Sequence, residues 1–397
     1  MSAPMFDAHA LAGRVRICPG PAQPGRTTLH STRPDWVPRL SAGRRAEQLP
    51  TLLASVFTLC GHAHHWTSRR AIAAAQGQGS AAAAQDVQRH RLATLREHIL
   101  RISHDWPHLL PGAAPQPDVA LLLRACPVWR EDLPVADRLA DLPDWLAQKW
   151  LGQPVADWLR AHEDAPTTWS PRWAAHHRSP LARLLHSQHA ALQALTTPAL
   201  ALDLLGDAAP ITLPMLARQM AEPGFCAQPH WQAEVPDTGP WSRHADPLRC
   251  PARSAWDRLL ARLVEVLRLA VEAGASSVGS VGGEAWLAHG ALALGERTGL
   301  AWTEMARGLL VHRVQLDAAD TVRSCHVLAP TEWNFHPEGV LAQALRRLPD
   351  SAPPALDAAA RRLAVAFDPC VAFDIEPPSP RVGEGRGEGA HRGDPHA

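Results

Sequence analysis

Two cysteines far apart in the chain lie in short segments of a kind that binds metals. Cys60 belongs to the segment TLCGHAHHW, and Cys370 follows an Asp-Pro pair in AFDPCVAFDIE. Each could begin a C-x-x-C pair, in which two thiols serve one metal ion or one redox centre. The positions of the second cysteines are taken by Ala63 and Phe373 instead. Periodicity alone does not indicate whether the two remaining thiols meet.

The histidines beside Cys60 offer a zinc interpretation. Cys60 and His64 are four residues apart, so a helix would place both on one face, and both are zinc ligand types. A structural zinc site needs four ligands, and no second cluster has suitable spacing, so this stays a minority interpretation. Burial in the core is the usual fate of a free cysteine. We predict core positions for the other five: Cys18, Cys126, Cys226, Cys250 and Cys325.

Three charged residues also have ordinary interpretations when taken one at a time. Asp105 follows a helical segment and could be a residue of its last turn. Arg307 precedes a strand-like segment and could be a solvated charge. Asp368 stands before a proline, where a carboxylate often orders a turn.

The composition of the 397 residues excludes several classes of function. Lys plus Arg and Asp plus Glu both total 39, which argues against a nucleic-acid partner or an anionic membrane surface. No apolar run reaches the roughly 20 residues of a membrane helix, and no signal peptide is recognisable. The seven cysteines show no disulfide spacing. We therefore expect reduced thiols, a cytoplasmic location and no membrane insertion. Tyrosine is absent, and Lys149 is the lone lysine.

Helical patterns dominate the chain, with a few short strands. Ser254 and Asp257 resemble a capping box, and Gly274 is a natural helix stop. Segments 150–180 and 221–252 are rich in Pro and Trp and are interpreted as long loops. The predicted regular elements are a strand at 13–18, a β-hairpin at 308–330 and helices at 85–103, 181–197, 254–274 and within 350–370.

The fold class predicted from these patterns is α+β and predominantly α-helical. We find no composition break before the C-terminal tail, so residues 1–378 are expected to form one domain. Residues 379–397 are rich in Pro, Gly and Arg without apolar periodicity, and they are predicted to be disordered.

Taken together and in order, the motifs resemble those of the large subunit of nickel–iron hydrogenases and its non-catalytic relatives. That family carries C-G-x-C near the N-terminus and D-P-C-x-x-C-x-x-H near the C-terminus, with E-x-x-R-G-x-L-x-H and V-P-[ST]-x-W-N between them. The corresponding segments here are GRVRI, LCGHAHH, RISHDW, EMARGLLVH, LAPTEWN and FDPCVAFDIE. The resemblance implies a large-subunit-like helical domain with small N-terminal and C-terminal β elements.

In the hydrogenases, four thiolates hold nickel and an iron that carries two cyanides and one carbonyl. By resemblance, Cys60 and Cys370 occupy the positions of the terminal nickel ligands, whereas Ala63 and Phe373 replace the bridging cysteines. The family's proton-relay glutamate corresponds to Ala12 here, and its final histidine, at the cleavage signal, corresponds to Glu376. The resemblance therefore implies no enzymatic hydrogen turnover and no nickel.

The polar residues around the diatomic ligands are retained. Arg307, Pro330 and Thr331 match family positions that surround the cyanides, and Asp105 and Asp368 match acids that orient the arginine. The retention of only the first cysteine of each pair resembles the pattern of the HupK/HoxV group of hydrogenase expression/formation proteins. That resemblance implies a scaffold on which Cys60 and Cys370 transiently hold iron as Fe(CN)2CO.

The implied partners are a hydrogenase large-subunit precursor and maturation proteins of the HypC/HypD type. Two alternatives stay open. One is a degenerate hydrogenase-like interaction or sensor subunit without metal cargo, and the other is a zinc-binding structural protein that uses the histidines at 62–65.

Overall fold

The computed structural model describes residues 13–21, 27–79, 81–114, 118–246, 250–271 and 286–376. Four sequence-based expectations lie outside these residues: Ala12, the helix stop at Gly274, the domain boundary at 378 and the tail at 379–397. Within the described residues, no helix is long and apolar enough to cross a membrane.

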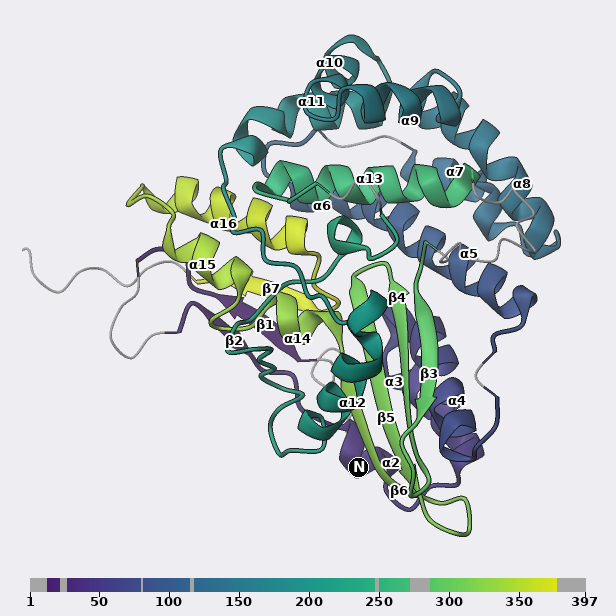
Figure 1. Ribbon diagram of the computed structural model, residues 1–397. Helices are drawn as coiled ribbons and strands as arrows, with labels where there is room; N and C mark the ends of the chain where they lie inside the picture. The colour runs from purple at the N-terminus through teal and green to yellow at the C-terminus, as the bar shows by residue number, and fades with distance from the viewer. Residues whose placement is uncertain are drawn as a thin grey trace, which may run out of the picture.

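A layer of helices packs around α13 and forms the largest hydrophobic core (Figure 1). α13 (Ala255–Val271) is buried on nearly every side, and its buried residues include three charged ones, Arg258, Arg262 and Glu265. Its start is fixed as predicted, because the Ser254 hydroxyl accepts a hydrogen bond from the Asp257 N–H at 3.2 Å. The helices around it are α5 (Ala84–Leu100), α6 (Trp106–Leu109), α7 (Val119–Arg124), α8 (Val135–Leu146), α9 (Val155–Asp164), α10 (Trp169–His176), α11 (Pro180–Gln193), α15 (Val340–Arg346) and α16 (Pro353–Phe367).

The larger sheet is antiparallel, in the order β3-β4-β5-β6, and helices cover both of its faces. Its strands are β3 (His289–Ala293), β4 (Thr298–Met305), β5 (Gly308–Leu316) and β6 (Val322–Leu328). Neighbouring residues on β4 face opposite layers: Leu300 packs in the cluster that contains α12 (Ala209–Gln219), and Ala301 packs in the one that contains α4 (Gly61–Ala75). Gly299 permits the close approach of α4, because a Cβ there would lie 2.0 Å from the Ala71 carbonyl oxygen.

The N-terminal and C-terminal segments meet in a three-stranded sheet, β2-β1-β7. β1 (Arg14–Ile17) pairs antiparallel with β2 (Leu29–Ser31) and parallel with β7 (Ala372–Ile375), with Val15 opposite Phe373. This pairing holds the segment that follows Cys370. The remaining helices are α2 (Val37–Ser41), α3 (Leu49–Val56) and α14 (Pro330–Asn334).

The predicted helices at 85–103, 181–197, 254–274 and within 350–370 and the hairpin at 308–330 are confirmed, with bounds shifted by a few residues or ending at the last described one. The loop predicted at 150–180 is wrong, because it contains α9 and α10. Pro154 precedes the first turn of α9, where a proline is tolerated. Trp158 and Trp173 then pack edge to face in the core, with ring centroids 5.7 Å apart.

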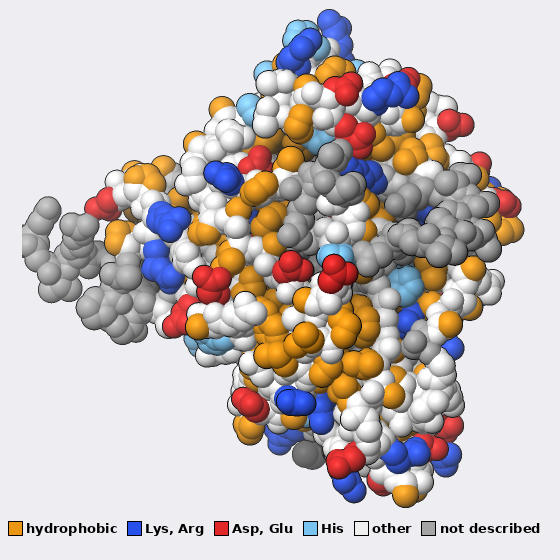
Figure 2. Space-filling model, viewed as in Figure 1, with side chains coloured by type: hydrophobic (Ala, Val, Ile, Leu, Met, Phe, Trp, Pro, Cys, Tyr) orange, Lys and Arg blue, Asp and Glu red, His pale blue; other side chains and the backbone are white. Residues whose placement is uncertain are grey.

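The second predicted loop is confirmed where the structure describes it. Residues 221–246 and 250–252 contain no element longer than the 3-10 turn Pro240–Ser242. Just before this loop, the outer face of α12 exposes Ile211 and Met215, and hydrophobic side chains gather over this part of the molecule in Figure 2.

Candidate functional site

Cys60 lies at the junction of a short 3-10 turn and α4, which brings its thiol under the large sheet. Its side chain is buried and packs in a small cluster with Ala63, Met305, Leu310 and Ala329. The glycine that follows is required by packing. A Cβ at Gly61 would lie 2.7 Å from the Ala54 carbonyl oxygen, so a larger residue would push α3 and α4 apart.

Cys370 is placed by the turn between α16 and β7. Asp368 ends α16 in the left-handed conformation (φ 51°), and Pro369 prevents the helix from continuing. The Cys370 Sγ lies 3.0 Å from the Oγ1 of Thr331. Thr331 stands in the first turn of α14, directly after Pro330.

Cys60 and Cys370 line one cavity of about 1010 Å³, although they come from opposite ends of the chain. Half-buried Cys226 is a third cysteine in the wall of this cavity. Much of its wall is apolar, from residues that include Trp36, Val37, Leu40, Phe57, Leu59 and Phe373. Burial raises the pKa of the Cys60 thiol, and the nearby Cys370 raises it further, whereas Arg307 and Arg33 lower it. Cys60 is therefore a neutral thiol at pH 7 that must lose its proton to bind a metal.

Arg307 occupies the two-residue tip of the β4–β5 hairpin and points into the protein. Its Nη1 donates a hydrogen bond of 2.6 Å to Glu97. Its Nε is buried without a hydrogen-bond partner among the described residues, 3.5 Å from an oxygen of Asp368. Burial alone would lower the pKa of Arg307, but Asp368 and Glu97 outweigh it and raise that pKa.

Asp368 is the centre of a buried charge cluster. Its carboxylate lies 2.8 Å from the Nε of Arg101, 2.9 Å from the Nη1 of Arg262 and within salt-bridge range of Arg307. Burial would raise the pKa of this carboxyl, but the three guanidinium groups, Arg101 first, lower it to about 2. Glu97 pairs with one of these arginines and Asp105 with another, so the cluster is balanced in charge.

The expectation that Asp105 orients Arg307 is wrong. Asp105 instead lies 2.6 Å from Arg101, and Glu97 supplies the carboxylate that binds Arg307. The physical reason is a π-helical turn, Arg101–Asp105, at the end of α5. Such a turn shifts the helix register, and π-turns are frequent at functional sites.

We predict that Asp368 makes folding stability sensitive to acid. Because its folded-state pKa lies below 3.8, its contribution is complete above that value and is lost as the pH falls toward about 2. The shift corresponds to about 2 kcal/mol in the free energy of unfolding. In urea unfolding at several pH values, the free energy of unfolding of Asp368→Asn should fall less steeply with acid than that of the exposed control Asp374→Asn. Equal slopes would contradict the prediction.

Sequence reasoning missed Glu97, Arg101, Arg262 and Arg33. Glu97 and Arg101 lie four residues apart in the predicted helix at 85–103, and Asp105 follows four residues later, which is a readable signal for one charged face. Arg262 lies on the buried helix α13, and Arg33 pairs with Glu332 at 2.6 Å. These two had no local sequence signal.

The residues at the two bridging positions cannot bind metal. Ala63 is buried beside Cys60, and the half-buried ring of Phe373 lines the cavity, with the Arg361 guanidinium 5.8 Å from its centroid. The zinc interpretation of Cys60 and His64 receives no support. The His64 Nδ1 lies 3.1 Å from the Nε2 of His312, and burial lowers the pKa of both imidazoles.

The other five cysteines differ in burial. Cys126 and Cys325 are buried as predicted, and Cys18 and Cys226 are half-buried. The core prediction for Cys250 is wrong, because the long loop exposes it. All seven thiols are free.

The arrangement of helices and sheets is that of a nickel–iron hydrogenase large subunit. A chain of the NiFeSe hydrogenase from Desulfovibrio vulgaris Hildenborough matches with a TM-score of 0.51 and 13% identity, over 86% of this chain and 92% of that one. An NAD+-reducing NiFe hydrogenase matches with a TM-score of 0.50 and 19% identity, over 86% and 91%. At this identity, the likeness concerns the fold alone.

Sequence comparison identifies the family to which the chain belongs among proteins of this fold. The chain is 36% identical to the hydrogenase expression/formation protein HoxV of Cupriavidus necator, over 94% of this chain and 97% of that protein. It is 30% identical to HupK of Bradyrhizobium diazoefficiens, over 85% and 89%. No protein-family model matches. The chain therefore belongs to the HoxV/HupK family of hydrogenase expression/formation proteins, which confirms the resemblance predicted from its motifs and supports a role in hydrogenase maturation.

Proposed function

We propose that the protein carries an Fe(CN)2CO fragment during maturation of a NiFe hydrogenase large subunit. The observation that carries this proposal is the meeting of Cys60 and Cys370 at one cavity, next to the buried charge cluster that holds Arg307. The names of the relatives support a role in hydrogenase maturation, and the chemistry of the cavity supports Fe(CN)2CO as the cargo.

The residues that line the cavity, together with Arg307 and Thr331 in contact with them, fit such a fragment. Two soft thiolates can hold one low-spin iron. The nitrogen of a cyanide accepts hydrogen bonds, and the unpartnered Nε of Arg307 and the hydroxyl of Thr331 are suitable donors. Arg307 and Arg33 lower the pKa of the Cys60 thiol, so both favour the thiolate that iron requires.

The absence of the bridging cysteines explains how the protein would release the iron fragment. Without sulfur at Ala63 and Phe373, the site cannot assemble the four-thiolate binuclear centre, so we expect neither bound nickel nor enzymatic hydrogen turnover. An acceptor subunit with four thiolates offers the iron more ligands, which makes transfer downhill. Proteins of the HypC/HypD type would supply the fragment, and a hydrogenase large-subunit precursor would accept it. Seven free thiols fit a reducing compartment, which we take to be the cytoplasm.

Thr331→Val is expected to weaken iron loading by about 10–100-fold, the effect typical of losing a hydrogen bond to a metal ligand. The substitution keeps the side-chain volume and removes the hydroxyl that lies 3.0 Å from the Cys370 sulfur. Thr303→Val is the matched control, because Thr303 is another buried threonine whose hydroxyl bonds to Thr67 instead. Iron analysis after anaerobic purification measures the iron loading of both variants, and equal loading would count against a role for Thr331.

Metal analysis of protein purified anaerobically from a host that makes active hydrogenase tests the function itself. Iron without nickel, lost in Cys60→Ser, supports the carrier. Protein without iron supports the alternative of an interaction or sensor subunit. Zinc that is lost in Cys60→Ser would support the zinc alternative.

A further inference from the structure

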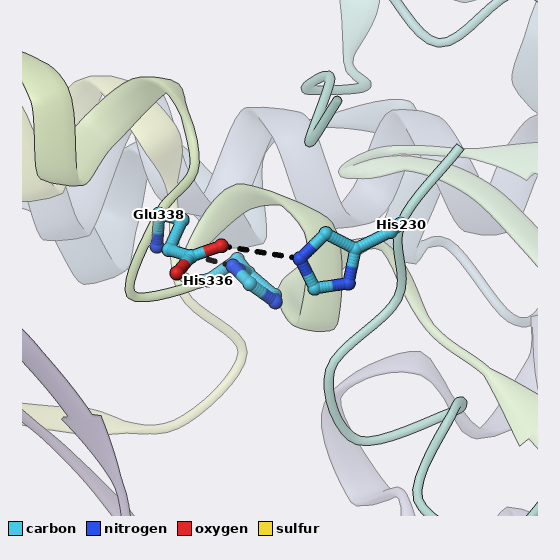
Figure 3. Close-up of side chains that lie close together, drawn as sticks. All are labelled: His230, His336 and Glu338. Atoms are coloured by element: carbon cyan, nitrogen blue, oxygen red, sulfur yellow. Dashed lines mark hydrogen bonds and ion pairs between the residues drawn. The ribbon is translucent and has the colours of Figure 1, made fainter. Parts of the chain in front are cut away.

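Three potential metal ligands come together away from the cavity. His230 lies in the loop after α12, whereas His336 and Glu338 lie in the connection between α14 and α15 (Figure 3). One ligand atom from each of the three lies within 4.8 Å of the other two. Among the described residues, no other group of three histidine, cysteine or acidic side chains meets this condition.

The three side chains are already oriented toward one another. The His230 Nε2 lies 3.2 Å from the Oε2 of Glu338, and the two imidazole rings meet edge to face with centroids 4.8 Å apart. His336 is only 2% exposed. Its Nε2 is buried and has no hydrogen-bond partner within the described residues. Buried polar atoms nearly always have a partner, so this imidazole nitrogen is available to a metal ion.

We propose that His230, His336 and Glu338 bind a divalent first-row transition-metal ion, for which zinc is the best-matched probe. Two imidazoles and one carboxylate form a known three-ligand set for zinc, in which the fourth position is open to water. Part-exposed His230 and exposed Glu338 leave that position accessible. The motifs that define the cavity do not include these residues, so this site is independent of the proposed cargo.

The protonation state of the ligands suits a cation. Burial, together with the nearby His230, lowers the pKa of His336 to about 4, and the ring is therefore neutral at pH 7. The His230 hydrogen bond lowers the pKa of Glu338, which is ionised. Binding through Nε2 moves the ring proton of His336 to Nδ1, which gives up the 3.1 Å hydrogen bond from the Glu338 N–H. Arg346, which donates a hydrogen bond to the Pro337 carbonyl, is a nearby positive charge that opposes the binding of a cation.

The expected consequence is a cross-link beside the cargo cavity. The ion would join the loop around His230 to the end of α14. The first turn of that short helix holds Thr331 against Cys370. Metal binding would thus raise the thermal stability of the protein and fix one wall of the cavity.

Calorimetric titration with zinc tests the proposal in the full chain with Cys60→Ser, Cys226→Ser and Cys370→Ser, which removes the three thiols that line the cavity. We expect one zinc ion per chain in that background. His230→Ala and Glu338→Gln should each weaken binding at least tenfold, whereas His30→Ala, at an exposed histidine on β2, should not. Cobalt in place of zinc should give an absorption spectrum without thiolate charge-transfer bands.

Two results would overturn the site. One is the absence of zinc binding in the background protein, and the other is equal affinity in His230→Ala, Glu338→Gln and the His30→Ala control. Because iron loading at the cavity is measured separately and needs the cysteines, failure here would leave the carrier proposal intact, and the converse also holds.

Discussion

Replacement of Cys370 by alanine is expected to abolish iron loading and, with it, hydrogenase activity in the host. Cys370 shares the cavity with Cys60 and Cys226, and burial raises the pKa of both of these thiols. Thiols that resist deprotonation are poor ligands for iron. Thr331 would also lose the sulfur that it contacts. Iron content and hydrogenase activity should fall together to background.

Cys250→Ala is the matched control, because Cys250 is an exposed cysteine on a loop and its loss should change neither quantity. Normal hydrogenase maturation in the Cys370→Ala host, under limiting iron and in air, would contradict the carrier role. The interaction-only function would then take its place.

The largest effect on stability is expected from Arg243→Met, which should lower the free energy of unfolding by about 3–5 kcal/mol. Arg243 and Glu265 are both fully buried, and Arg243 donates hydrogen bonds of 2.6 and 2.7 Å to the two carboxylate oxygens. It also bonds to the Met305 carbonyl, beside the hairpin tip that carries Arg307. Removing the arginine leaves a buried carboxylate whose remaining hydrogen-bond donors, among the described residues, are the neutral side chains of His98 and Trp286.

Burial would raise the pKa of Glu265, but Arg243 outweighs it and holds that pKa below its usual range. The mutant should therefore be most destabilised at neutral pH. Arg14→Ala is the control: its ion pair with Asp374 spans 2.8 Å but is about half exposed, and such pairs contribute about 1 kcal/mol or less. Urea unfolding compares the two variants, and equal losses would contradict the prediction.

The sequence predicted the parts of the fold that follow from local pattern. The apolar periodicity of α5, α11, α13 and α16 is strong, and these helices were found with nearly correct bounds. α9 and α10 were missed because their prolines, which a helix accepts in its first turn, suggested a loop. β3 and β4 were missed because their segments are short or buried on both faces, so they lack the alternation typical of a strand.

The site was predictable only through the resemblance. No spacing rule brings Cys60 to Cys370, since their proximity depends on the pairing of β7 with β1 across the whole chain. The motif residues Arg307, Thr331 and Asp368 do gather near these cysteines. Their actual partners depend on helix register and tertiary contact, and for this reason Asp105 was assigned to the wrong arginine and Glu97 was overlooked.

The most direct test of the carrier function is infrared spectroscopy of the protein purified anaerobically from a host with active maturation proteins. We expect stretching bands from two cyanides and one carbonyl on iron, without nickel in the sample. These bands should be absent from Cys370→Ala and present in Cys250→Ala. Iron-free protein without such bands, or bands that persist in Cys370→Ala, would contradict the claim that Cys60 and Cys370 hold the fragment.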